Sequence, residues 1–97
     1  MKEVESTSDY DEFRADLKDL RALAIIRARI ERLRCGNPGS YRRLEKGVSE
    51  LKIDFGPGYR VYYTERHDGT LVVLLAGGDK STQQADIARA YRLVASL

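Results

Sequence analysis

The chain has 97 residues, 42% hydrophobic and 33% charged, with a formal net charge of +2, which suffices for one small domain and excludes a second domain or a large internal cofactor cavity. Its longest uncharged apolar run, Leu71 to Ala76, is far shorter than the roughly 20 residues of a membrane span. The charged start MKEVES lacks the apolar core of a signal peptide. We therefore expect a cytoplasmic protein with no membrane partner. Cys35 and His67 are the only cysteine and histidine, which excludes a disulfide framework or a His/Cys zinc cluster within one chain, and we expect no cofactor and no metal.

Two helices are predicted after a short strand at residues 1–7. Acidic residues follow Ser8, where the helix macrodipole favours them, so the first helix is expected to start there. Apolar residues at helical spacing predict one buried stripe on each helix: Tyr10, Phe13, Leu17 and Leu20 on the first, and Leu23, Ile26, Ile30 and Leu33 on the second. The sequence CGNPG at 35–39 is expected to end the second helix.

Three strands follow, because from Val48 the apolar period changes from helical to alternating. Residues 50–55 (ELKIDF) and 59–66 (YRVYYTER) alternate apolar and polar side chains, so one face of each is expected to point to solvent. Residues 71–76 (LVVLLA) are apolar on both faces, as in a central strand. A Gly-Pro-Gly loop and the dipeptide Asp68-Gly69, which suits a two-residue hairpin turn, are expected to join the strands.

These turns predict the registers, and the registers decide which side chains are neighbours. A three-residue loop at 56–58 pairs Phe55 with Tyr59, Lys52 with Tyr62 and Asp54 with Arg60. A two-residue loop at 68–69 pairs His67 with Thr70 and Arg60 with Gly77. We therefore expect four side chains to converge at one end of a solvent-facing side of the sheet: Lys52, Arg60, Tyr62 and Lys80.

A closing helix is predicted after the stretch GGDKSTQQ at 77–84. Ser81 and Gln84 fit an S-x-x-Q capping box, and an apolar stripe follows it. The stretch is not a P-loop, because Asp79 stands directly before Lys80, where that motif requires glycine. We interpret Gly77 and Gly78 as the backbone freedom needed to leave a strand. A lysine beside a helix N-terminus is opposed by the dipole, so the position of Lys80 indicates an anion nearby.

Charge is distributed unevenly along the chain. Residues 1–20 contain three basic and seven acidic residues, whereas the remainder contains 14 basic and eight acidic ones. The basic part is either a surface for a polyanion or an ordinary solvated face, and charge alone leaves both open.

The fold class indicated is α+β, in the order β-α-α-β-β-β-α, and residues 47–90 carry a resemblance to a known family. The stretch GVSELKIDFGPGYRVYYTERHDGTLVVLLAGGDKSTQQADIARA resembles the HigB-type toxins, a phage-derived group of addiction-module toxins in the RelE/ParE superfamily. For the N-terminal half the similarity lies mainly in the β-α-α order. The resemblance implies a small, mainly antiparallel sheet with two N-terminal helices packed on one face and a C-terminal helix.

The resemblance also implies a function and partners. It predicts the toxin of a type II toxin-antitoxin system, a ribosome-dependent mRNA interferase that inhibits translation and is neutralised by a helix-turn-helix, HigA-like antitoxin. Its partners would be that antitoxin, the ribosome and mRNA, with DNA reached only through the antitoxin. An antitoxin would cover the cations with an acidic segment or pack an apolar helix on the N-terminal helices, and the acidic first helix offers a separate surface.

Metal-free RNA cleavage needs a base for the 2′-OH, charge stabilisation at phosphorus and an acid for the leaving 5′-oxygen. Arg60 fits the second role, because a guanidinium binds two phosphate oxygens, and by resemblance it matches the arginine that follows tyrosine on the middle strand of RelE-type toxins. The alternative for Arg60 is an ion pair with Asp54. Lys52 and Lys80 are candidates for phosphate contact or proton transfer, or are ordinary surface lysines.

Four further residues are RNA-binding candidates: Tyr62, Arg66, His67 and Asp79. Tyr62 would stack on a splayed base or belong to the core. His67 is the only imidazole but occupies a turn that needs polar residues anyway. Asp79 would act on the 2′-OH or hold Lys80.

Two other functions remain open. One is a ParE-like, non-catalytic inhibitor of DNA gyrase, since a superfamily fold does not fix the target. The other is a basic partner-binding module without toxicity.

Overall fold

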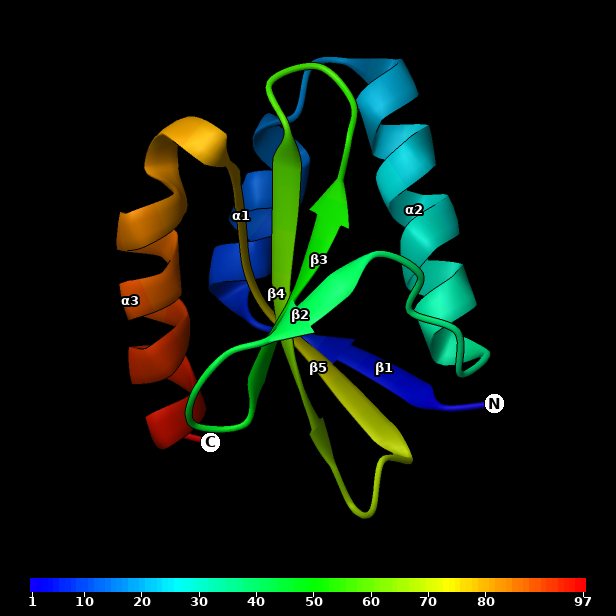
Figure 1. The fold of residues 1–97 in the computed structure, drawn as a ribbon, viewed down its shortest axis with the longest axis vertical. Coiled ribbons are helices and arrows are strands. Elements are labelled where there is room, and N and C mark those ends of the chain that lie inside the picture. The colour runs from blue at the N-terminus through cyan, green and yellow to red at the C-terminus, as the bar shows by residue number, and fades with distance from the viewer.

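The protein is an α+β domain in three layers, and the computed structural model describes all of residues 1–97. Its strands are β1 (Glu3–Ser6), β2 (Tyr41–Arg43), β3 (Val48–Ile53), β4 (Tyr59–Arg66) and β5 (Leu71–Asp79). Its helices are α1 (Ser8–Asp16), α2 (Leu20–Arg34) and α3 (Gln83–Ala95), and one 3₁₀ turn at Lys80–Thr82 precedes α3 (Figure 1). No helix is both long enough and apolar enough to cross a membrane.

The five strands form one mixed sheet in the order β1-β5-β4-β3-β2. β1 runs parallel to β5, and all other neighbours are antiparallel. The predicted order of elements is thus confirmed except for β2, a three-residue edge strand that the sequence analysis did not predict. Its sequence, Tyr-Arg-Arg, carries no apolar alternation, and all three residues are exposed.

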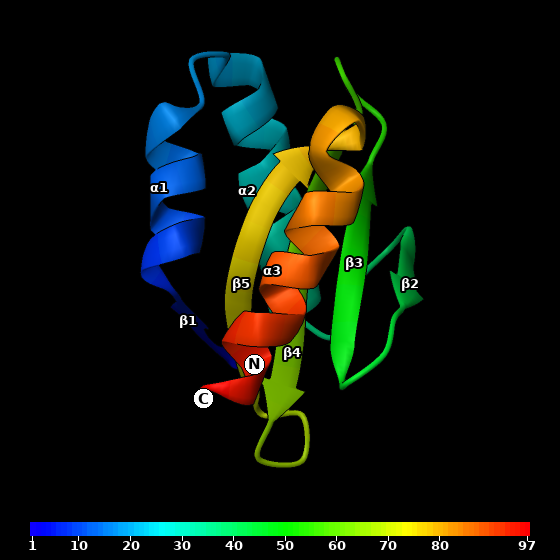
Figure 2. The same ribbon diagram turned by 90° about the vertical axis from the view of Figure 1, so that its left-hand side faces the viewer.

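Helices cover both faces of the sheet, with α3 on one face and α1 and α2 on the other (Figure 2). The side chains buried beneath α1 and α2 include Tyr10, Ile26, Leu51, Val61 and Tyr63. Those beneath α3 include Val48, Tyr62, Leu75, Ala76 and Ala90. The expectation of a solvent-facing side on β3 and β4 is therefore wrong, because α3 packs against that side.

The two N-terminal helices each begin with a capping residue whose side chain accepts hydrogen bonds from backbone N–H groups of the first turn. Thr7 caps α1 and Asp19 caps α2 through their side-chain oxygens. Tyr10, Phe13 and Leu17 contact the core as predicted, but Leu20 is 77% exposed. The predicted stripe is wrong at Leu20 because α1 ends at Asp16 and Leu20 opens the next helix in a new direction.

The strand registers agree with the predicted ones beside the β4–β5 turn and differ elsewhere. In the β3–β4 pair, Lys52 lies opposite Arg60 and Ile53 opposite Tyr59, so the connection is longer than three residues. In the β4–β5 pair a bulge between Tyr62 and Tyr63 moves Arg60 opposite Gly78 instead of Gly77. Next to the turn, from Tyr63 with Leu74 to Arg66 with Leu71, the register is the predicted one. The Thr70 N–H donates to the His67 carbonyl oxygen at 3.2 Å, although the ladder itself ends at Arg66 and Leu71.

Candidate functional site

Three cations lie where β3 ends, β4 begins and β5 ends. Lys52 on β3 is directly opposite Arg60 on β4, and Arg60 is opposite Gly78, two residues before Lys80. We call Lys52, Arg60 and Lys80 the basic end. The convergence of these three residues is confirmed, although the register that produces it is different.

Arg60 is a buried guanidinium that forms no ion pair. The residue is only 4% exposed, and its Nη1 donates to the carbonyl oxygens of Gly58 at 3.1 Å and Tyr59 at 3.0 Å. Its buried Nε has no hydrogen-bond partner, and none of the five ion pairs of the structure includes Arg60. The alternative of an ion pair with Asp54 is thus not observed, because the register places Asp54 beyond the end of β3.

The pairing of Lys52 with Arg60 is unfavourable for the fold. Like charges directly opposite each other on neighbouring strands repel, and neither residue has an acidic partner. A pair of like charges that no ion pair neutralises lowers stability, and such local costs are typical of functional sites. The most direct way to relieve this repulsion is an anion bound between the two side chains.

Gly58 lets Lys80 approach Arg60. Gly58 has a φ of +81°, and a Cβ there would lie 3.1 Å from Cδ of Lys80 and 3.5 Å from Nη1 of Arg60. The aliphatic part of the Lys80 side chain therefore passes close over Gly58, and a side chain at position 58 would push Lys80 away. Lys80 is exposed, and its ammonium forms no hydrogen bond or ion pair with the protein, so this side chain is free to move.

Asp79 caps the 3₁₀ turn instead of holding Lys80. Its carboxylate accepts from the Ser81 backbone N–H at 2.8 Å and the Ser81 hydroxyl at 2.5 Å. The hydrogen bond from the Ser81 hydroxyl, and after it the one from the Ser81 backbone N–H, lower the pKa of Asp79. The carboxylate therefore stays ionised and is a weak base. The predicted capping box at Ser81 and Gln84 is wrong, because Asp79 and Thr82 form the box one turn earlier.

Tyr62 lies in the core beneath α3 and has no exposed surface. Burial and then the neighbouring carboxylate of Glu50 raise the pKa of its hydroxyl. In this position the ring cannot stack on an RNA base. Of the two roles expected for Tyr62, the structure shows a place in the core.

Arg66 and His67 lie at the opposite end of β4 from Arg60. Six residues of extended strand separate the two arginines, about 20 Å at the usual rise per residue. His67 occupies a turn and has a φ of +54°. These two residues are therefore not brought together with the basic end.

Two carboxylates that the sequence pattern does not mark are buried beside α3, and one of them, Glu50, joins α3 to the sheet. Glu50 is fully buried and accepts from Arg42 Nε at 2.8 Å and from Gln83 Nε2 at 2.9 Å. Asp86, 4% exposed, accepts from the Thr82 hydroxyl at 2.6 Å. No periodic pattern marks these residues, since the groups that hold Glu50 come from β2 and α3.

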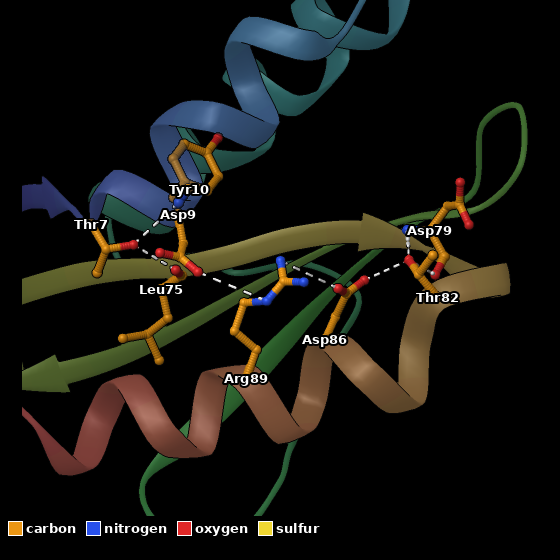
Figure 3. Close-up of polar contacts among 8 residues, drawn as sticks. All are labelled: Thr7, Asp9, Tyr10, Leu75, Asp79, Thr82, Asp86 and Arg89. Atoms are coloured by element: carbon orange, nitrogen blue, oxygen red, sulfur yellow. Dashed lines mark hydrogen bonds and ion pairs between the residues drawn. The ribbon is translucent and has the colours of Figure 1, made fainter.

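Arg89 links α3 to the first helix. Its guanidinium lies between Asp9 of α1 and Asp86 of α3, at 3.8 Å from a carboxylate oxygen of each (Figure 3). Asp86 in turn contacts Thr82, which approaches the backbone N–H of Asp79 at 3.4 Å. This chain of polar contacts positions the start of α3, and with it the turn that carries Lys80.

Comparison with known proteins finds one relative over nearly the whole chain. The chain is 47% identical over 95 residues to a protein of Haemophilus influenzae described as "Uncharacterized protein", and the alignment covers 98% of this chain and 95% of that protein. No family model matches the chain.

Proposed function

This chain and the Haemophilus influenzae protein belong to one family, and from the geometry of the basic end we propose that the protein cleaves mRNA on the ribosome. In this proposal it is a metal-independent endoribonuclease and the toxin of a type II toxin-antitoxin system, with the RelE/ParE-like topology that residues 47–90 suggest. Its site of action would then be the cytoplasm.

The observation that carries the proposal is the pairing of two cations, neither of which forms an ion pair. Lys52 and Arg60 face each other across two strands, Arg60 is 4% exposed, and its Nε is unpartnered. A buried unpaired charge is expensive, and a phosphate group supplies both the missing charge and the missing acceptor. Lys80 adds a third cation at the same end.

Arg60 and Lys80 would act by stabilising charge at phosphorus. In the reaction the 2′-oxygen of RNA loses its proton and bonds to phosphorus, while the bond to the 5′-oxygen breaks and that oxygen takes up a proton. Negative charge grows on the non-bridging oxygens in the transition state, and cations that face those oxygens lower its energy. The Lys80 ammonium, which forms no ion pair in the protein, would turn toward the bound phosphate.

The ribosome supplies what the isolated chain lacks. Asp79 has a lowered pKa and Tyr62 a raised one, so neither exchanges a proton readily near neutral pH. The single histidine lies at the other end of β4. We therefore expect weak cleavage of free RNA and efficient cleavage of mRNA that ribosomal RNA and tRNA hold in an attack geometry.

A helix-turn-helix antitoxin would silence the protein by covering the basic end. An acidic segment of the antitoxin would neutralise Lys52, Arg60 and Lys80 and block access to mRNA. Contact with DNA would occur through the antitoxin alone.

The test is primer extension on one mRNA translated in a purified system with added protein. Lys80→Ala should reduce cleavage within the translated frame about 100-fold, because it removes one cation that faces the transition state. Lys80 is exposed and unpaired, so this variant should keep its fold. Arg66→Ala, which removes an exposed cation at the far end of β4, should cleave like the wild type.

Intact transcripts with wild-type protein on translating ribosomes would overturn the proposal. If supercoiling by DNA gyrase stops while transcripts stay intact, the protein is a gyrase inhibitor. If neither target is affected, the basic end serves a partner without toxicity.

A further inference from the structure

A hollow of about 300 Å³ lies beside the basic end. It is lined by the five residues Asp54–Gly58 of the β3–β4 connection and by Lys80. Lys80 therefore belongs to the wall of this hollow and also approaches Arg60 across Gly58. A group bound in the hollow would sit directly next to a phosphate bound at the basic end.

Asp54 contributes a carboxylate with no role in the fold. It is exposed, accepts no hydrogen bond and forms no ion pair. Its charge opposes the lowering of the Arg29 pKa by burial, but the Nη groups of Arg29 donate instead to the carbonyl oxygens of Lys52, Pro38 and Ser40. The carboxylate oxygens of Asp54 are thus free to accept from a ligand.

A carboxylate beside a phosphate site repels the RNA backbone, so its position requires a compensating interaction. Base edges provide one, because proteins read single-stranded RNA through hydrogen bonds to splayed bases. Guanine presents N1–H and N2–H side by side and fits both oxygens of a carboxylate. Adenine and cytosine present one donor beside an acceptor, and uracil presents its N–H between two acceptors.

We propose that the hollow binds the nucleobase next to the scissile phosphate and that Asp54 makes guanine the preferred base. This inference rests on the proposed function and adds a specificity-determining residue to it. The Gly56–Pro57–Gly58 turn, Phe55 and the Lys80 stem form the walls against which the base would lie. Arg21 lies over the Phe55 ring, 5.7 Å from its centroid, and holds that ring in place.

Binding of nucleotides tests the pocket without any cleavage. In an NMR titration of the pure protein, guanosine 3′-phosphate should shift the amide signals of Gly56, Gly58 and Lys80 and bind about tenfold more tightly than adenosine 3′-phosphate. In Asp54→Asn the tenfold ratio should fall to near one. Asp68→Asn, the same change at an exposed turn at the far end of β4, should keep the wild-type ratio.

Cleavage gives the second readout. On translating ribosomes, mRNAs that differ in one base should be cut by the wild type about tenfold more often beside guanine than beside adenine, and Asp54→Asn should lose that ratio while it still cleaves. The same base profile in both proteins would overturn the role of Asp54 and leave the nuclease intact. Selective binding of guanosine 3′-phosphate without cleavage would overturn the nuclease and leave the pocket. Equal binding of both nucleotides by the wild type would overturn the preference for guanine, and unchanged amide signals of Gly56, Gly58 and Lys80 would overturn the pocket.

Discussion

At the scale of single residues, Glu50 shows how a buried charge is made tolerable. Burial alone would raise the pKa of its carboxyl, but hydrogen bonds from Gln83 and Arg42 outweigh that effect and the pKa is lowered. The folded state therefore favours the carboxylate more strongly than the unfolded state does. The stability that Glu50 contributes is present above the ordinary glutamate pKa of about 4.3 and is lost as the pH falls toward the lowered value.

Glu50→Gln should reduce the free energy of unfolding by about 2 kcal/mol at pH 7, because the charge-assisted hydrogen bond from Arg42 is lost. The difference from wild type should shrink as the pH falls below the ordinary glutamate pKa of about 4.3, since the unfolded wild-type chain then takes up a proton that the folded protein does not. Urea unfolding at both pH values measures it. Glu45→Gln, at an exposed position without an ion pair, is the matched control, and an equal loss there would contradict the assignment to the buried site.

At the scale of elements, Gly77 and Gly78 allow helices to approach both faces of β5. A Cβ on Gly77 would overlap the Phe13 ring of α1, and a Cβ on Gly78 would overlap the Asp86 carboxylate of α3. Neither glycine has a positive φ. The interpretation that they supply freedom to leave the strand is therefore wrong, and their role is close packing.

Gly77→Ala should destabilise the fold by about 3 kcal/mol, because the added methyl group overpacks the contact between β5 and α1. Gly36→Ala separates this effect from backbone strain, since Gly36 has a φ of +91° but nothing within 4 Å of its Cβ position. That variant should lose only about 1 kcal/mol. Thermal unfolding compares the two, and a smaller loss for Gly77→Ala than for Gly36→Ala would contradict the packing role.

How far the fold could be predicted from the sequence also differs between elements. Strands β3 and β4 and the three helices were predictable because each has several apolar residues at one clear period, and β5 was predictable as a short, continuous apolar run beside a turn. β2 was not, since Tyr41–Arg43 is short and exposed. The bulge at Tyr62 and the burial of Glu50 depend on contacts between distant segments, and no local pattern encodes them. For the same reason the residues of the basic end were predicted correctly while their registers were not.

At the scale of the whole molecule, helices on both faces of the sheet restrict where chemistry can occur. The strand interiors are buried under α3 on one side and under α1 and α2 on the other. Arg29 closes part of one end by binding three carbonyl groups of β3 and the 38–40 loop. The end formed by β4, β5 and the turn at Lys80 is left for a ligand, which is where the unpaired cations lie.

Because helices cover both faces of the sheet, the tyrosines buried beneath them should ionise only at a raised pH. Burial raises the pKa of Tyr10 and of Tyr63 to about 12, and burial with the Glu50 charge raises that of Tyr62 further. Tyr10 and Tyr63 lie in the core beneath α1 and α2, whereas Tyr62 lies in the core beneath α3. At about pH 11, above the ordinary tyrosine pKa of about 10, all three should still be protonated in the folded protein.

Absorbance at 295 nm, which reports tyrosinate, should therefore rise at about pH 11 when denaturant unfolds the protein. Because the folded state keeps protons that the unfolded state releases, the free energy of unfolding should fall as the pH rises from about 10 to 12. Tyr62→Phe should reduce the absorbance step on unfolding by about one tyrosine, since it removes the group beneath α3 alone. Full ionisation at about pH 11 with the circular dichroism of the folded protein unchanged would show that the helices do not seal the sheet, and phosphate-binding sites in the strand interiors would then have to be considered beside the basic end.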